Sequence, residues 1–163
     1  MDGIWQIATD PDNSGRAKEW YANPPTRELK GINVPGVIQE VFPNYDGVAW
    51  YFTTFLLSAD KIAGGRYLLQ FGAVDYLCEA WLNGAYLGLH EDAEEPFGFD
   101  ITDSLANHGE NLLALRVLSP YEEPVDGIVL AEIPHANKFN RKFTPGCALN
   151  FGGVTRPVSL ISV

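Results

Sequence analysis

The sequence is poor in cysteine, in methionine and in positive charge. Its 163 residues include two cysteines and one methionine, and 11 Lys and Arg oppose 21 Asp and Glu, for a formal net charge of −10. Two cysteines cannot form the set of bridges that holds small secreted domains together. Because a strongly acidic chain repels phosphate backbones and anionic headgroups, nucleic acid and membranes are not expected partners.

Long hydrophobic runs are also absent. No apolar run approaches the roughly 18–20 residues that a membrane-spanning helix needs. The start of the chain, Met1 to Trp5, has neither the basic nor the apolar region of a signal peptide. We therefore expect no membrane span and no signal peptide within this chain, and the compartment where it works stays unknown.

No spacing of Cys and His indicates a metal site, and we expect no cofactor. Cys78 lies in an alternating apolar segment, where a buried thiol packs like a small hydrophobic side chain. Cys147 lies in a loop rich in Gly and Pro. The sequence leaves open whether Cys78 is a free buried thiol or forms a disulfide with Cys147.

What the sequence does contain is many short apolar segments separated by 16 Gly and 11 Pro. Several segments alternate with period two, the pattern of strands with one face on a core. The length favours one domain over residues 1–163, and no segment shows a long helical stripe. The pattern predicts an all-β domain of two packed sheets or a barrel. Predicted strands are residues 50–57, 66–71, 74–82, 86–89, 111–118 and 156–163.

The segment 74–82 illustrates the alternation. One face carries Val74, Tyr76, Cys78, Ala80 and Leu82. The other face is mixed and carries Asp75, Leu77, Glu79 and Trp81, so we expect Trp81 to be partly exposed. Asn83-Gly84 then predicts a tight turn into the next strand.

Few segments favour other structure. Residues 17–22 predict a short turn, and residues 100–105 begin with a capping residue and predict one or two helical turns. Residues 120–146 hold several Pro and Gly and predict a long loop over one end of the sandwich. Loops of that length are usually functional or contact a neighbour.

Four stretches in this order resemble the N-terminal sugar-binding domain of glycoside hydrolase family 2, which holds β-galactosidases, β-glucuronidases and β-mannosidases. The first runs from Asp2 to Ala8, with Asp10-Pro11 following. The second, residues 46–55, is similar to a "WYR-x-F" strand with Phe52 in place of Arg. The third, residues 71–103, carries Asp75-Tyr76, Trp81-Leu82-Asn83-Gly84 and Pro96-Phe97-Gly98-Phe99-Asp100-Ile101-Thr102, and continues through residues 109–117. The fourth, residues 152–158, is similar to "GGI-x-RPV".

This resemblance implies a jelly-roll β-sandwich of the galactose-binding type. In the family the catalytic acid and nucleophile are two Glu residues on a separate (β/α)8 barrel. Such a barrel needs roughly 250 residues of alternating strand and helix, more than this chain holds. We therefore expect no catalytic residue here and expect the chain to be part of a larger polypeptide.

The acidic cluster of residues 91–95 superficially offers the pair of carboxyl groups that a retaining glycosidase requires. It lies in a short loop between Gly88 and Pro96, where carboxylates are solvated. We interpret it as a solvated turn, with catalysis as the weaker hypothesis.

Sugar recognition pairs an aromatic surface with planar polar groups that bind hydroxyls. The candidates for carbohydrate binding are Trp81, Trp20, Tyr45, Asn44, His90 and Asn150. Packing in the core is the alternative role for each Trp. The resemblance also implies that loops of this domain reach the mouth of the barrel, but Cys147 stands where the family has an acid.

Candidate interface residues are Arg156, His135, Lys138 and Arg141. Arg156 can pair with a carboxylate of a neighbouring domain. The other three belong to a cationic-polar segment in an acidic chain, which suits either the missing barrel or a second copy of the chain; a solubilising loop is the alternative.

Three functions remain open. The leading one is a non-catalytic domain that flanks the active site of a family 2 β-glycosidase and binds free sugar only weakly. The second is an autonomous carbohydrate-binding module, since fold alone cannot separate the two. The third is a structural or assembly domain without sugar contact.

Overall fold

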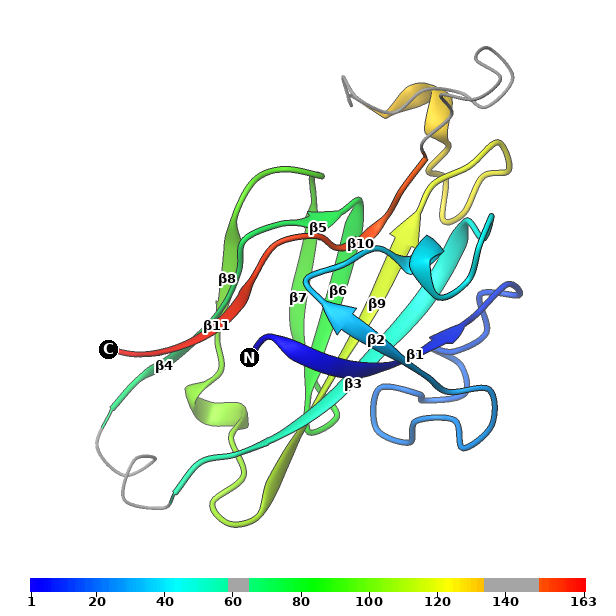
Figure 1. Cartoon of the computed structure of the whole chain (residues 1–163). Coiled ribbons are helices and arrows are strands. Elements are labelled where there is room, and N and C mark those ends of the chain that lie inside the picture. Colours follow the sequence, from blue (N-terminus) through cyan, green and yellow to red (C-terminus); the bar gives the residue numbers. More distant parts are fainter. Residues whose placement is uncertain (59–64, 134–149) are drawn as a thin grey trace.

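The computed structural model describes residues 1–58, 65–133 and 150–163. Within these residues the regular structure consists of β-strands and three 3-10 turns, without an α-helix. The strands form antiparallel sheets of six, three and two strands (Figure 1). The all-β prediction is confirmed.

The six-stranded sheet is built around its two longest strands. β3 (Gly47–Leu56) pairs with β9 (Glu110–Ser119) over ten residues, from Gly47 opposite Ser119 to Leu56 opposite Glu110. β1 (Gly3–Thr9) and β2 (Lys30–Val34) extend the sheet on one side, and β6 (Leu77–Leu82) and β7 (Ala85–Glu91) extend it on the other.

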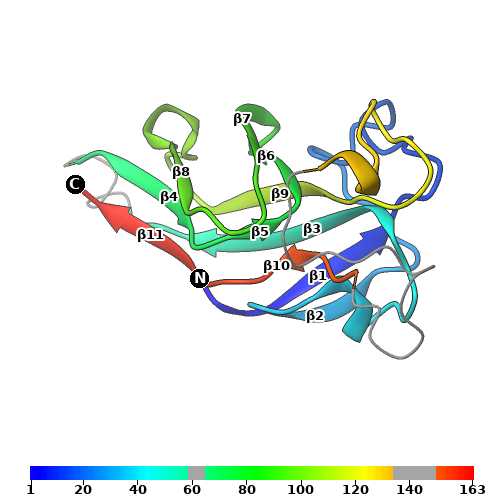
Figure 2. The ribbon, with the colours of Figure 1, turned by 90° about the horizontal axis from the view of Figure 1, so that it is seen from above.

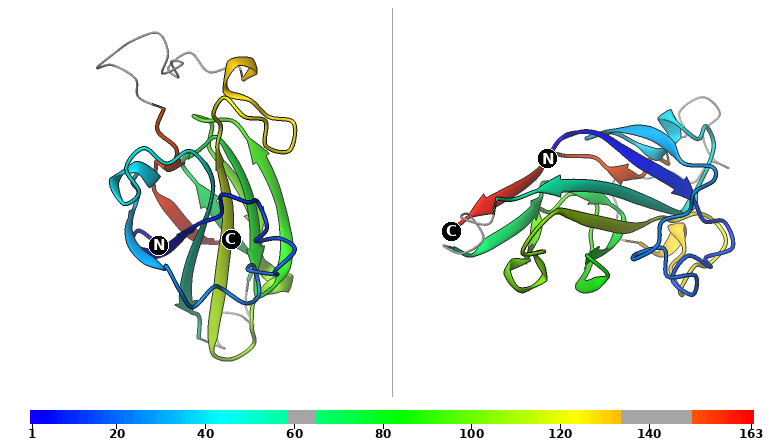
Figure 3. Two further views of the ribbon diagram at one scale, coloured as in Figure 1. Left: turned by 90° about the vertical axis from the view of Figure 1, so that its right-hand side faces the viewer. Right: turned by 90° about the horizontal axis from the view of Figure 1, so that it is seen from below.

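The second layer is smaller and lies against this sheet (Figures 2 and 3). Its three-stranded sheet has the order β11 (Val158–Ser162), β4 (Tyr67–Phe71), β8 (Phe97–Asp100). β5 (Val74–Asp75) pairs with β10 (Gly153–Val154) beside it. The 3-10 turns are η1 (Ile38–Glu40), η2 (Thr102–Ser104) and η3 (Leu130–Glu132).

The core between the layers is apolar. Alternate residues of the large sheet, such as Ile7, Tyr51 and Leu115, pack with Leu69 and Phe71 of β4. Cys78 is fully buried in this core, and burial raises the pKa of its thiol. The sheets thus form the predicted sandwich.

The outer face of the large sheet is also buried, because loops cover it. Trp50, Phe52 and Trp81 form a second cluster there, under the loops of residues 10–29 and 120–133. Trp81 is only 6% exposed and stacks on Tyr21 and on Trp50 at ring-centroid distances of 5.3 and 5.2 Å. The expected partial exposure of Trp81 is therefore wrong.

The remaining differences are local. β2, β8 and β10 were not among the predicted strands. The five residues of β2 offer only Ile32 and Val34 as an apolar pair, and β8 and β10 are only four and two residues long. The predicted strand 74–82 is divided between β5 and β6 at Tyr76. Residues 17–22 form turns. In residues 100–105, Asp100 ends β8 and the predicted helical turns are reduced to the single 3-10 turn η2.

Candidate functional site

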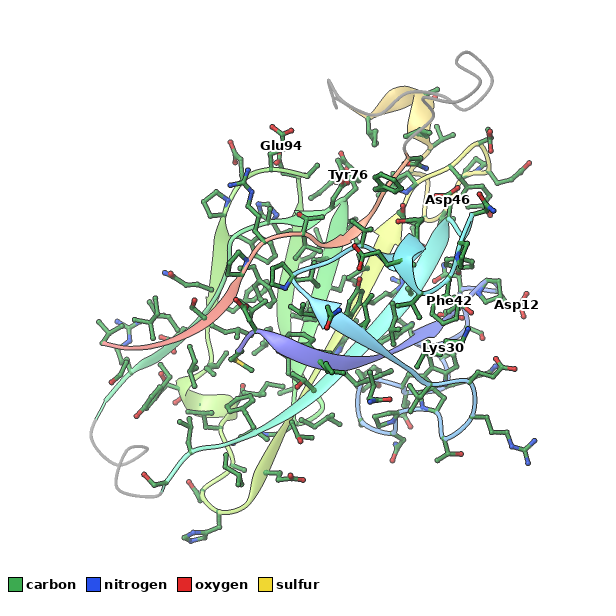
Figure 4. All side chains as sticks on the ribbon, viewed as in Figure 1. Asp12, Lys30, Phe42, Asp46, Tyr76 and Glu94 are labelled. Carbon is green, nitrogen blue, oxygen red and sulfur yellow. The ribbon has the colours of Figure 1, made fainter. Side chains whose placement is uncertain are left out.

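Three loops meet at the end of the sandwich where β3 begins and β9 ends. They are residues 41–46, 120–133 and 150–152. Asn150, 2% exposed, donates from Nδ2 to Asp46 Oδ1 at 3.1 Å and to the Pro120 carbonyl at 2.6 Å. Figure 4 shows Asp46 and Tyr76 at this end. The Asn150 amide joins the three loops, so its structural role is plain from the geometry.

Gln39 makes a second connection between these loops. Its Nε2 donates to the Tyr45 carbonyl at 2.7 Å, and its Oε1 accepts from the Gly152 N–H at 3.1 Å. Gln39 lies in η1 and was not predicted from the sequence, since a single Gln carries no signal of this role.

Asn44 and Tyr45 differ in how accessible their side chains are to a ligand. The Tyr45 hydroxyl donates to the Val48 carbonyl, and burial raises its pKa. Asn44 is exposed and has a positive φ of 63°, which Asn tolerates better than most residues. Of the two, Asn44 is the one whose side chain faces solvent at this end.

The other side of the same end holds Tyr76 and a turn of acidic residues. Tyr76 Oη donates to Glu91 Oε1 at 2.9 Å; burial and then this bond raise the pKa of Tyr76 to about 12. Asp92 Oδ1 accepts from the N–H groups of Glu94 and Glu95 at 2.7 and 2.8 Å. Glu91, Glu94 and Glu95 are exposed, as expected for a solvated turn.

A small groove lies between these groups and the loop 120–133. Its volume is about 190 Å³. It is lined by Tyr76, Glu91, Gly127, Ile128, Val129, Glu132 and Ile133.

A larger hollow lies on the outer face of the six-stranded sheet, away from the end loops. It has a volume of about 430 Å³. Its lining is mainly apolar, with Gln6, Thr53 and Thr54 as the polar residues. The exposed Ile4 stands at its rim, 73% accessible to solvent.

The candidate sugar-binding residues fall into three places. Asn44, Tyr45 and Asn150 belong to the end loops, as described above. Trp20 is half-buried and meets Trp50 edge-on at 6.2 Å, in the same outer cluster as Trp81. The His90 ring stacks on Phe97 at 4.1 Å, between β7 and β8.

A buried charge network, missed by the sequence analysis, holds two loops on the outer face. Arg116 on β9 is fully buried, and its Nη1 contacts Glu79 Oε2 on β6 at 2.9 Å. Its Nη2 contacts Asp126 Oδ2 at 2.8 Å, and Arg16 Nη2 lies equally close to that oxygen. The sequence did hold a signal for this network. Glu79 and Arg116 are opposite charges, and each lies within a predicted strand that is otherwise mainly apolar.

Asp10 organises the first of these loops. Its carboxylate accepts from the N–H groups of Ser14 and Gly15, both at 2.8 Å, and from Trp50 Nε1 at 3.0 Å. The loop is thereby fastened to the central Trp of the outer cluster.

The candidate interface residues are only partly described. Arg156 is exposed in the bend between β10 and β11, and no acidic side chain in the described ranges forms an ion pair with it. His135, Lys138, Arg141 and Cys147 lie outside the described residues.

Residues 1–58, 65–133 and 150–163 contain no group of three His, Cys, Asp or Glu arranged to hold a metal ion. They also contain no helix with the length and hydropathy to cross a bilayer.

The fold and its end loops define a jelly-roll sandwich domain. The model of the family "Glycosyl hydrolases family 2, sugar binding domain" matches residues 1–163. The chain therefore belongs to this family, which confirms the resemblance found in its motifs.

Similar proteins are much longer than this chain. A β-glucuronidase of Paenibacillus borealis is 28% identical over 122 residues, which are 72% of this chain and 20% of that protein. A β-galactosidase large subunit of Leuconostoc lactis is 35% identical over 97 residues, 60% of this chain and 15% of that protein. The apo structure of a Ruminococcus gnavus β-glucuronidase covers the whole chain with a TM-score of 0.78 and 21% identity, and the match spans 28% of that structure. At that identity the last likeness supports the fold alone.

Proposed function

We propose that this chain is one domain of a larger family 2 β-glycosidase, in which it flanks the active site of a separate catalytic barrel and supplies no catalytic acid or nucleophile. One observation carries the proposal: the family match extends over residues 1–163. Relatives named as β-glucuronidase and β-galactosidase extend far beyond the matched part, since the match covers 20% and 15% of their lengths.

In this proposal the surface that faces the sugar is the end formed by the loops of residues 41–46, 120–133 and 150–152. Asn44 supports this assignment, because its exposed planar amide can bind hydroxyls. Asn150 and Tyr45 stabilise these loops through their hydrogen bonds to Asp46, to the Pro120 carbonyl and to the Val48 carbonyl. Arg156, His135, Lys138 and Arg141 remain proposed contacts to the barrel.

The mass of the native polypeptide tests the larger-enzyme proposal. An immunoblot of the source organism with an antibody against this domain is expected to give a band several times heavier than 18.0 kDa. A sole band at the mass of the chain would contradict the proposal. The purified chain is further expected not to hydrolyse aryl β-glycosides. If the purified chain does hydrolyse them, and Glu91→Gln or Glu94→Gln abolishes this activity, the hypothesis that the chain itself is catalytic would be supported.

A weaker second candidate is an autonomous carbohydrate-binding module, favoured by the hollow of about 430 Å³ on the outer face. Calorimetry with a panel of mono- and disaccharides separates the two. A domain that supplies half of a shared site is expected to bind no better than millimolar, equivalent to about 4 kcal/mol. Micromolar binding that is lost in Gln6→Ala, which removes a polar group from the lining of that hollow, would favour the module instead.

A further inference from the structure

The loop after β9 is built as a self-contained unit. We call residues 121–133 the strap. Val125 and Ile128 exchange backbone hydrogen bonds of 3.0 and 2.9 Å across Asp126-Gly127, and both turn residues have positive φ, 50° and 81°. Asp-Gly suits such a turn because it accepts positive φ at both positions. The Leu130 N–H closes the unit on the Tyr121 carbonyl at 3.0 Å.

Among the residues that the structure describes, one side chain carries the polar attachment of this unit to its surroundings. Asp126, at the tip of the turn, contacts Arg116 on β9 and Arg16 in the loop of residues 10–29, each at 2.8 Å. Asn13 Nδ2 adds a hydrogen bond of 3.1 Å to Asp126 Oδ1. Figure 2 shows the two loops side by side, in blue and yellow.

Beneath the strap lies apolar surface. Val125, Ile128 and Ile133 are partly buried against the outer cluster, which includes Leu77 and Leu118. Their burial is incomplete, whereas Leu77 and Leu118 are 5% and 0% exposed. The strap is thus a cover whose removal would leave an apolar patch on the sheet.

We propose that the strap is a releasable cover, with Asp126 as its latch: when the Asp126 contacts are broken, residues 121–133 lift as a unit and uncover the outer cluster, while the six-stranded sheet stays folded. The sheet can survive because Arg116 keeps Glu79 at 2.9 Å and Asn13 Oδ1 at 2.7 Å. This inference holds whether or not the domain belongs to a glycosidase.

Acid is one way to open the latch. The charged groups around Asp126 are Arg16, Arg116 and Glu79, and the charges of Glu79 and Arg16 also act on the Tyr86 hydroxyl. Burial alone would raise the pKa of Asp126, but the two guanidinium groups hold it below its usual range. A carboxyl with a lowered pKa stabilises the folded state above its unfolded pKa and stops doing so as pH falls through the folded value. The strap is therefore fastened at neutral pH and released in acid.

Hydrogen exchange measured by mass spectrometry on the whole chain tests the latch. In Asp126→Asn at pH 7, the amides of residues 121–133 are expected to exchange about 10- to 100-fold faster, while those of β9 keep their protection. Glu123→Gln is the matched control, because it removes the same charge from an exposed position of the strap that forms no ion pair in the described ranges. Binding of the dye ANS should rise in Asp126→Asn and stay unchanged in the control.

Two results would overturn the proposal. Unchanged exchange of the strap in Asp126→Asn would mean that aliphatic packing alone holds it. Equal loss of protection in the strap and in β9 would mean that the strap is part of the global fold. If Asp126→Asn does not fold, Arg16→Gln removes one of the two guanidinium contacts from an exposed side chain and permits the same measurement.

Discussion

The two faces of the six-stranded sheet are both buried, but by different kinds of partner. The inner face packs on a second sheet, and residues such as Leu113, Leu115 and Val117 of β9 make it apolar. The outer face packs on two loops, and the intervening Arg116 is as inaccessible as its neighbours. A sheet supplies its own backbone hydrogen bonds, whereas a covering loop needs side chains to fix it. The charges and the Trp cluster of the outer face serve that purpose.

The largest effect is expected from removing the centre of the outer network. Arg116→Ala leaves Glu79, only 7% exposed, without its main partner. Breaking one side of a buried ion pair costs about 3–5 kcal/mol, and we expect this loss in the free energy of unfolding in urea at pH 7.

Leu115→Ala, on the adjacent inward-facing residue, is the control for Arg116→Ala. It creates a cavity at a cost of about 2–5 kcal/mol, but it leaves the charges untouched. Only the Arg116 variant should therefore change the dependence of stability on pH between 3 and 7. Parallel pH profiles for the two variants would refute a special role for charge on the outer face.

A smaller effect is expected at the attachment of the first loop. Asp10→Ala removes the acceptor of two backbone N–H groups and of Trp50 Nε1. A buried donor left without a partner costs about 1–3 kcal/mol. The tryptophan fluorescence of the chain should shift as the environment of Trp50 changes, while the exchange of inner-face amides stays unchanged.

Ser14→Ala is the control for Asp10→Ala. The Ser14 hydroxyl lies 3.5 Å from Asp10 Oδ1, so its removal disturbs little. An equal loss of stability in the two variants would show that the carboxylate does not organise the loop.

The sequence predicted the inner face well and the outer face poorly. Alternation placed Cys78, Ala80 and Leu82 on the core side of β6, where the structure has them. The same alternation made Trp81 look half-exposed, because a period-two pattern cannot show which distant loop covers a face. Trp81 is buried by Tyr21, which lies 60 positions earlier in the chain. Of the end loops, the sequence predicted only residues 120–146, of which 134–149 lie outside the described residues. The joining role of Asn150 needed the geometry of Asp46 and Pro120.

The smallest effect on stability is expected at the exposed ion pair of Arg66 and Asp100, in contrast to the buried Arg116. Asp100 has a pKa of about 2, lowered first by the Thr102 hydroxyl, which donates to Oδ1 at 2.6 Å, and then by Arg66, whose Nη2 lies 2.6 Å from Oδ2. Stability linked to Asp100 is present above its unfolded pKa and is lost as pH falls toward 2. An NMR titration should show a larger upward shift of this pKa in Thr102→Ala than in Arg66→Gln, with Thr102→Ser close to the parent. A larger shift in Arg66→Gln would mean that the ion pair, rather than the Thr102 hydroxyl, sets the pKa of Asp100. The exposed Asp100 would then depend on a guanidinium partner in the same way as the carboxylates around the buried Arg116 do.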